Sequence, residues 1–204
     1  MFDVEGFILV GGQSSRMGTD KSQLSFGRQT SVERIAAALE PLVAKVSLVG
    51  ARLKADAIGL DSIPDTHNRW GALGGIQAAL AACHSKWAVI VACDLPLVSD
   101  GLFLRLWQLL QRNPAPFDAI VPIQPDQRPQ PLCAIYRREP CSATVERLIA
   151  EGEHKPRALL GNVRTRWVEF RELADLPGAE FFFLNVNTPG DYEQAVKALA
   201  SLPE

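Results

Sequence analysis

Short, continuously apolar runs alternate along this chain with segments whose apolar residues recur at helical spacing. The most apolar run is KWAVIVACD at 86–94, and similar runs occur at 6–10, 45–50 and 118–123. Such runs are typical of strands buried on both faces, as in a parallel sheet covered by helices. The alternation therefore predicts a single three-layer α/β/α domain over residues 1–204, with a mostly parallel sheet.

Amphipathic segments and capping residues predict where the helices lie. Thr30 and Glu33 are spaced as a capping box, and Thr188 precedes Pro189, a residue type favoured at the first helical position. Either Ser99 or the aspartate after it is expected to cap another helix. Helices are therefore expected at 30–39, 73–85, 100–113, 142–152 and 188–199, and additional strands at 131–137, 164–170 and 180–187.

The composition is that of an ordinary globular protein and argues against several classes of function. Hydrophobic residues make up 47% and charged residues 22% of the 204 residues, and the net charge is -2. A general nucleic-acid partner would require basic character, which a chain with this net charge lacks. A membrane helix requires about 18 apolar residues in a row, and no apolar run in the sequence approaches that length. Acidic residues near the N-terminus and four cysteines without a CxxC pair predict a reduced, cytoplasmic protein with no export signal and no zinc site. His67, His84 and His154 lie in unrelated contexts and support neither a catalytic triad nor a metal site.

The residues after the first predicted strand, GGQSSRMGTDKS at 11–22, combine small and cationic side chains. Their glycine spacing does not fit the dinucleotide motif G-x-G-x-x-G, and the lysine of a P-loop would directly follow its glycine. Glycines let backbone N–H groups approach a ligand closely, and Arg16 and Lys21 suit the charge of a triphosphate. The segment predicts a nucleotide-phosphate loop; the alternative is a tight turn whose charges face water.

Polar residues follow three of the predicted strands, at the edge where ligands bind in α/β sheets. Besides residues 11–21, these are Asp94, after the most apolar strand, and the segment 185–188. A carboxylate at such a strand end can bind Mg²⁺, and Asn185 and Asn187 would share one face of their strand. The alternatives are that Asp94 caps the following turn and that Asn187 only helps to cap the last helix.

The segment LVGGQSSRMGTDK resembles the signature of nucleotidyltransferases and is most similar to that of the molybdenum cofactor guanylyltransferase family. The similarity continues through IPD at 63–65, GALGGI at 71–76, VACDLPLV at 91–98 and NVNTPGDYEQA at 185–195. The resemblance implies a Rossmann-like nucleotidyltransferase fold. It also implies an enzyme that transfers GMP from Mg²⁺-GTP to the phosphate of molybdenum-bound molybdopterin and releases pyrophosphate.

The resemblance further implies roles for individual residues. Arg16, Lys21 and Asp94 are the implied catalytic groups, because the two cations would bind the phosphates and the carboxylate would bind the metal. Asp65 is implied to contact the base or ribose, although its local sequence equally fits an exposed turn. Nucleotide contacts are implied for Leu9, Val10, Gly11, Gly12, Lys21, Asp65 and Asp94, and acceptor contacts for Asn185, Asn187 and Arg157, with Lys155 as the alternative to Arg157.

Two other functions are compatible with the sequence. A cytidylyltransferase for molybdopterin or another small phosphorylated acceptor would have the same fold, but such relatives typically carry alanine where this chain has Gly11. The glycine leaves room for a purine and favours guanine. A non-catalytic nucleotide-binding regulator is disfavoured because Lys21 and Asp94 are both present. The implied cofactor is Mg²⁺, the implied substrates are GTP and molybdopterin, and transient contact with molybdoenzyme-maturation proteins is a further expectation.

Overall fold

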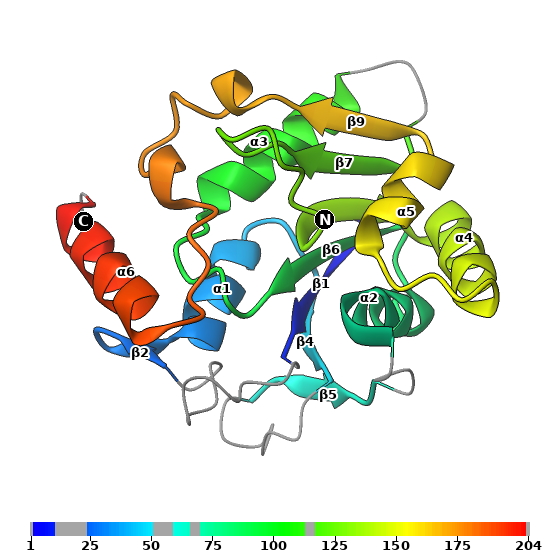
Figure 1. Ribbon diagram of the computed structural model, residues 1–204, viewed down its shortest axis with the longest axis horizontal. Helices are drawn as coiled ribbons and strands as arrows, with labels where there is room; N and C mark the ends of the chain where they lie inside the picture. Colours follow the sequence, from blue (N-terminus) through cyan, green and yellow to red (C-terminus); the bar gives the residue numbers. More distant parts are fainter. Residues whose placement is uncertain (1, 11–23, 51–58, 66–69, 113–116, 203–204) are drawn as a thin grey trace.

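The computed structural model describes residues 2–10, 24–50, 59–65, 70–112 and 117–202. These residues form a seven-stranded sheet and a two-stranded hairpin (Figure 1). The strands of the sheet are β1 (Val4–Leu9), β4 (Val46–Val49), β5 (Asp61–Ile63), β6 (Trp87–Ala92), β7 (Ala119–Pro122), β8 (Cys133–Arg137) and β9 (Thr165–Val168), and the hairpin is β2 (Ser25–Phe26) with β3 (Gln29–Thr30).

The sheet has the order β5-β4-β1-β6-β8-β7-β9 and is mostly parallel, as predicted. The exception is β8, which is antiparallel to both of its neighbours, β6 and β7. Antiparallel neighbours need only a short connection, and β8 follows β7 without an intervening helix. The sequence did not predict this reversal, because a buried antiparallel strand and a buried parallel strand have similar apolar residues.

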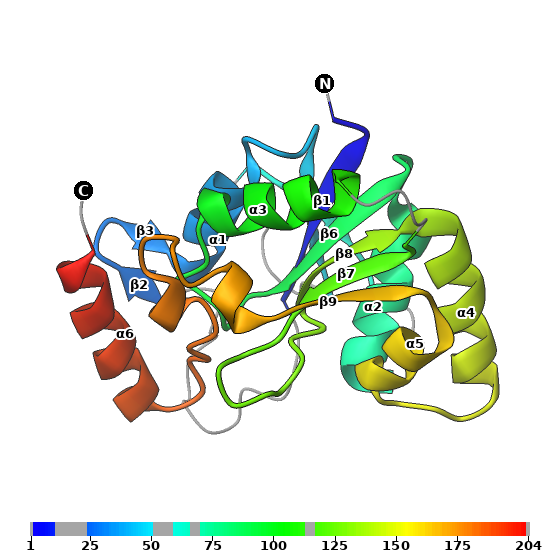
Figure 2. The same cartoon turned by 90° about the horizontal axis from the view of Figure 1, so that it is seen from above.

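Helices cover both faces of the sheet, which confirms the three-layer α/β/α prediction. In Figure 2, α1 and α3 lie on one face, whereas α2, α4 and α5 lie on the other. None of the helices in the described ranges is long and apolar enough to cross a membrane. Their bounds are α1 (Ser31–Leu39), α2 (Gly71–Ala82), α3 (Asp100–Gln111), α4 (Arg138–Ala150), α5 (Pro156–Asn162) and α6 (Pro189–Ser201).

The predicted capping residues occupy the starts of three helices. The side chain of Thr30 accepts a hydrogen bond from Glu33 N–H at 3.2 Å. The Glu33 carboxylate in turn accepts one from Thr30 N–H at 2.6 Å, which completes the capping box. Ser99 caps α3, and Thr188 caps α6 with the proline of that helix at its first turn. These local hydrogen bonds satisfy backbone donors that the first turn leaves without helical partners, so sequence alone located the three helix starts.

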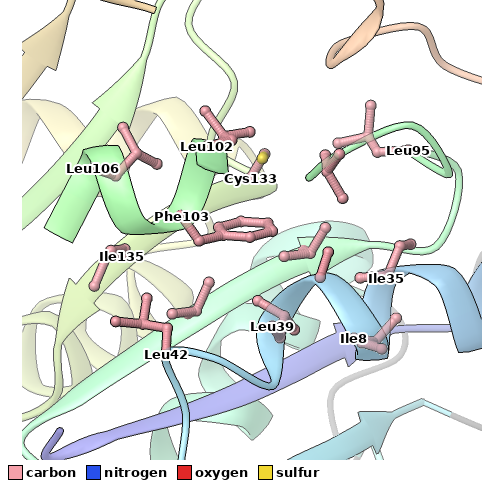
Figure 3. Close-up of a cluster of buried hydrophobic side chains, with 14 of the residues drawn as sticks. Ile8, Ile35, Leu39, Leu42, Leu95, Leu102, Phe103, Leu106, Cys133 and Ile135 are labelled. Carbon is pink, nitrogen blue, oxygen red and sulfur yellow. The ribbon is translucent and has the colours of Figure 1, made fainter. Parts of the chain in front are cut away.

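The apolar side chains form two main clusters and one smaller cluster. The first lies between the sheet and α1 with α3, and Figure 3 shows side chains of these elements around Phe103. The second lies between the sheet and α2, α4 and α5. The third joins the hairpin to α6 through Phe26 and Tyr192, whose ring centroids are 5.2 Å apart. The first two clusters fix the sheet, and the third attaches the C-terminal helix beside the hairpin.

The strand predicted at 180–187 does not form. The chain there contains a short 3₁₀ helix, Ala179–Phe181, and Leu184 N–H donates to the carbonyl of Phe181 at 3.0 Å, so the backbone turns repeatedly. The aromatic side chains consequently enter different clusters: Phe182 packs in the first cluster and Phe181 against the third. The apolar run is therefore a connecting segment that packs against the first and third clusters. Its hydrophobicity is the same as that of a buried strand, so the sequence pattern did not distinguish the two.

All four cysteines are buried and none forms a disulfide, so we expect the native protein to resist thiol alkylation. Burial raises the pKa of Cys83 to about 11 and that of Cys141 to about 12, and it raises the pKa of Cys133 still further. Because the thiolate is the reactive form, little of it is present at pH 8. Mass spectrometry after iodoacetamide treatment should show slow labelling of the native protein and four labels after unfolding. Rapid native labelling of any of these cysteines would contradict the packing described above.

Candidate active site

The carboxyl ends of β1 and β6 meet at the point where the order of the sheet reverses. From β1 the chain passes to β4 and β5 on one side, whereas β6 pairs with β1 on the other. Leu9 and Ala92 are paired at the ends of these strands, and Cys93 N–H donates to the carbonyl of Leu9 at 3.0 Å. Open α/β sheets bind ligands at such a switch point. Val10 leads from it into the glycine-rich segment, whose predicted site residues Gly11, Gly12, Arg16 and Lys21 lie outside the described residues.

Asp94 follows β6 at this switch point and is partly exposed. Every other residue from 87 to 98 is buried. A charged side chain at the end of so apolar a strand is tolerated because it is only partly buried. The structure therefore places Asp94 where a ligand at the switch point would meet it.

Asn185 and Asn187 lie beside Asp94, although not on a strand. Val186, which is buried between them, donates its N–H to the carbonyl of Asp94 at 2.9 Å. Both asparagines are half-buried. Thr188, not Asn187, supplies the side-chain cap of α6. The prediction that these asparagines accompany Asp94 is thus compatible with the structure, whereas the shared strand face that led to it is wrong.

Asp65 reaches the same edge through a close approach at Gly50. Gly50 has a positive φ of 84°, and a Cβ at this position would lie 3.2 Å from the carbonyl oxygen of Val10 and 3.7 Å from Cβ of Asp65. A residue with a side chain would be both strained and crowded here. The glycine therefore lets Asp65, which is half-buried, lie close to the exit of β1.

One glycine of the GALGGI segment, Gly75, serves packing between α2 and β1. A Cβ at Gly75 would lie 3.2 Å from Cδ1 of Leu9. The small residue lets α2 approach the carboxyl end of β1, where the predicted nucleotide contacts begin. The motif therefore contributes to the site through packing, because it sets the distance between α2 and the carboxyl end of β1.

Arg157 lies on the opposite flank of this edge from α6, as Figure 1 shows for α5 and α6. It is exposed on the first turn of α5, and Lys155, also exposed, immediately precedes that helix. The neighbouring His154 stacks on Trp70, which precedes α2, with ring centroids 4.2 Å apart and an interplanar angle of 21°. The stack holds the segment with both cations beside the start of α2. Sequence analysis missed it because the two rings are far apart in the chain.

The donor set at this edge fits Mg²⁺ that is shared with a substrate. Mg²⁺ is usually bound through one or two carboxylates together with substrate phosphates and water. Asp94 is a carboxylate of this kind, whereas the described ranges contain no group of three His, Cys, Asp or Glu side chains that could hold a metal ion. The site suits a cation held jointly by Asp94 and phosphate oxygens better than one enclosed by protein ligands.

The switch point, the glycine-rich segment and the carboxylate together define an α/β nucleotidyltransferase. A family model, the MobA-like NTP transferase domain, matches residues 6–167. This chain belongs to that family.

Relatives and solved structures agree with the family. The chain is 32% identical over 196 residues to a probable molybdenum cofactor guanylyltransferase of Pelotomaculum thermopropionicum, covering 96% of this chain and 93% of the relative. It is 31% identical to a relative of the same name from Carboxydothermus hydrogenoformans, covering 93% of each chain. The crystal structure of molybdopterin-guanine dinucleotide biosynthesis protein A from Archaeoglobus fulgidus superposes with a TM-score of 0.78 at 25% identity, covering 96% of this chain and 98% of that one.

Proposed function

We propose that this protein transfers GMP from GTP to the phosphate of molybdenum-bound molybdopterin, forming molybdopterin guanine dinucleotide and pyrophosphate. The observation that carries the proposal is the position of Asp94, at the end of a buried strand that pairs with the carboxyl end of β1, the strand that the glycine-rich segment follows in the sequence. Membership of the MobA-like family and the names of relatives matched over almost the whole chain support the choice of reaction.

The reaction requires alignment and charge neutralisation more than covalent catalysis. A phosphate oxygen of the acceptor is already an anionic nucleophile, so it can attack the α-phosphorus of GTP without a general base. The bond from the α-phosphorus to the bridging oxygen breaks, and pyrophosphate leaves with the negative charge. Arg16 and Lys21 would neutralise that charge, and Mg²⁺ bound at Asp94 would supply further positive charge beside the phosphate oxygens.

The remaining residues divide between the nucleotide and the acceptor. We assign the base and ribose to the backbone of residues 9–12 and to Asp65, which lies near the exit of β1. We assign the acceptor to Asn185 and Asn187 on the side of α6, and to Arg157 on the side of α5. The hydrogen bond from Val186 N–H to the Asp94 carbonyl supports the assignment of Asn185 and Asn187, whereas Arg157 belongs to α5 on the opposite flank.

We further propose that residues 1–204 act as one domain in the cytoplasm and pass the product transiently to molybdoenzyme-maturation proteins. The continuous sheet supports a single domain, and four buried cysteines outside disulfides agree with a reducing compartment. The product is a cofactor that functions only inside another protein, which is the reason for expecting a transfer step.

Product formation is expected with GTP in clear preference to CTP and ATP, because Gly11 offers its backbone to a purine edge without an obstructing side chain. The measurement is to incubate the protein with Mg²⁺, molybdopterin and one nucleoside triphosphate at a time, and to record product mass and pyrophosphate release. Gly11→Ala should weaken the use of GTP selectively. Gly161→Ala is the matched control, since a Cβ at that glycine meets open space.

The rival functions predict different results in the same experiment. Equal or better product formation with CTP would support a cytidylyltransferase. A regulator would bind nucleotide but release no pyrophosphate with any of the three.

A further inference from the structure

Each backbone carbonyl of the turn that carries Asp94 accepts a hydrogen bond. These are the five carbonyl groups from Ala92, the last residue of β6, to Pro96. Two donors lie within the turn: Leu95 N–H donates to Ala92 at 3.3 Å, and Val98 N–H donates to Leu95 at 3.5 Å. The other three donors come from distant parts of the chain, one of them from Val186 to Asp94 as described above.

Ser31, the first residue of α1, is the second distant donor. Its hydroxyl donates to the carbonyl of Cys93, the residue directly before Asp94. Only 1% of Ser31 is exposed. The hydroxyl is available for this bond because Thr30 already supplies the side-chain cap of the helix. Without Ser31 this carbonyl would lose one hydrogen bond in a buried setting, where each such bond restricts the backbone.

Arg34, almost one turn further along α1, is the third distant donor. Its Nε–H donates to the carbonyl of Pro96 at 3.1 Å, on the other side of Asp94. Next to it, Ile35 packs in the same buried cluster as Leu95, as Figure 3 shows. Helix α1 therefore holds the turn on both sides of Asp94 by hydrogen bonds and holds Leu95 by apolar packing.

The backbone of Ser31 makes a second connection across the site. Its N–H donates to the carbonyl of Leu24 at 2.9 Å, and Leu24 is the first described residue after 11–23. One residue thus joins the chain that follows the glycine-rich segment to the turn that carries Asp94.

We propose that Ser31 is a positioning residue: through the Cys93 carbonyl, it fixes the direction in which the Asp94 carboxylate faces Mg²⁺-GTP. The inference rests on the proposed function, in which Asp94 binds the metal. Because Ser31 is buried, it acts through Asp94 and does not touch the nucleotide. A residue that served only stability would change the melting temperature but not the dependence of nucleotide binding on Mg²⁺.

The test compares GTP dissociation constants of the full chain without and with Mg²⁺, in the absence of acceptor. The ratio of the constant without Mg²⁺ to the constant with Mg²⁺ reports how much the metal strengthens GTP binding, and measuring it requires no turnover. Ser31→Ala is expected to lower this ratio by about tenfold, as for other partners that orient a metal ligand. Ser31→Thr keeps the hydroxyl and should retain a ratio close to that of the wild type.

Two further variants make the comparison specific. Ser47→Ala removes another buried serine hydroxyl, in β4, and should leave the ratio unchanged whatever it does to the melting temperature. Asp94→Asn should reduce the ratio towards one. If Asp94→Asn reduces it while Ser31→Ala does not, or if Ser31→Thr loses as much as Ser31→Ala, the positioning role is wrong. If Asp94→Asn leaves the ratio unchanged, the metal assignment itself fails, and the inference fails with it.

Discussion

Turnover by the Asp94→Asn variant is expected to fall by about a hundredfold or more, while the protein folds normally and still binds some GTP. The amide keeps the shape of the side chain but removes an anionic oxygen, the ligand that a hard cation prefers. A metal at a phosphoryl centre is worth several kcal/mol of charge stabilisation, and each ~1.4 kcal/mol corresponds to a tenfold change in rate. The measurement is Mg²⁺-dependent pyrophosphate release together with the melting temperature, both on one preparation.

Asp100→Asn is the matched control for this experiment. Asp100 lies six positions further along the chain, at the exposed first turn of α3, where its carboxylate accepts a hydrogen bond from Gly101 N–H at 2.7 Å. The control makes the same chemical change away from the switch point, so turnover should stay near that of the wild type. If Asp94 instead serves only to cap its turn, Asp94→Asn will melt at a lower temperature and retain its activity per folded molecule. Near-normal turnover would remove Asp94 from the metal site.

The parts of the fold that sequence predicted are those that short-range physics determines. The run that forms β6 is apolar at every position because both faces of the strand are covered. Such a strand can be predicted from its own residues, without knowing which elements pack on it. Likewise, Thr30 and Thr188 cap their helices with partners only three residues away. The switch point followed from these elements, because strand ends in a parallel sheet share an edge.

The parts that sequence missed depend on contacts between distant residues. The hydroxyl of Ser31 donates to a carbonyl 62 positions away, and His154 stacks on Trp70, which is even further away in the chain. Nothing in the local pattern distinguishes a serine after a capping threonine from any other buried serine. The prediction of a strand at 180–187 failed for the same reason. The aromatic residues of this segment divide between two clusters that come together only when the chain folds. The hydrogen bond from Val186 N–H to the Asp94 carbonyl likewise joins distant residues, and no local periodicity predicts it.

Lys21→Ala and Arg16→Ala are each expected to impair the use of GTP by about 1.5–3 kcal/mol, the contribution of a hydrogen bond to a charged group. At ~1.4 kcal/mol per factor of ten, this corresponds to a loss of about ten- to a hundredfold in kcat/KM. Both positions follow the first strand in the sequence motif, and the proposed contacts are to the phosphates that leave as pyrophosphate. The melting temperature should barely change, because a cation that binds a ligand contributes little to the core.

The dependence on phosphate number distinguishes a phosphate contact from a general loss of positive charge. If Lys21 binds the terminal phosphates, Lys21→Ala should weaken the binding of GTP strongly and that of GMP hardly at all. Lys45→Ala is the matched control: it makes the same change in net charge at an exposed lysine that pairs with Asp61, at the opposite edge of the sheet. Because this pair is exposed and lies away from the proposed phosphate contacts, the variant should fold normally and GTP binding should be unaffected. A Lys21→Ala or Arg16→Ala protein that unfolds easily yet turns over normally would show that the residue supports the loop and not the triphosphate.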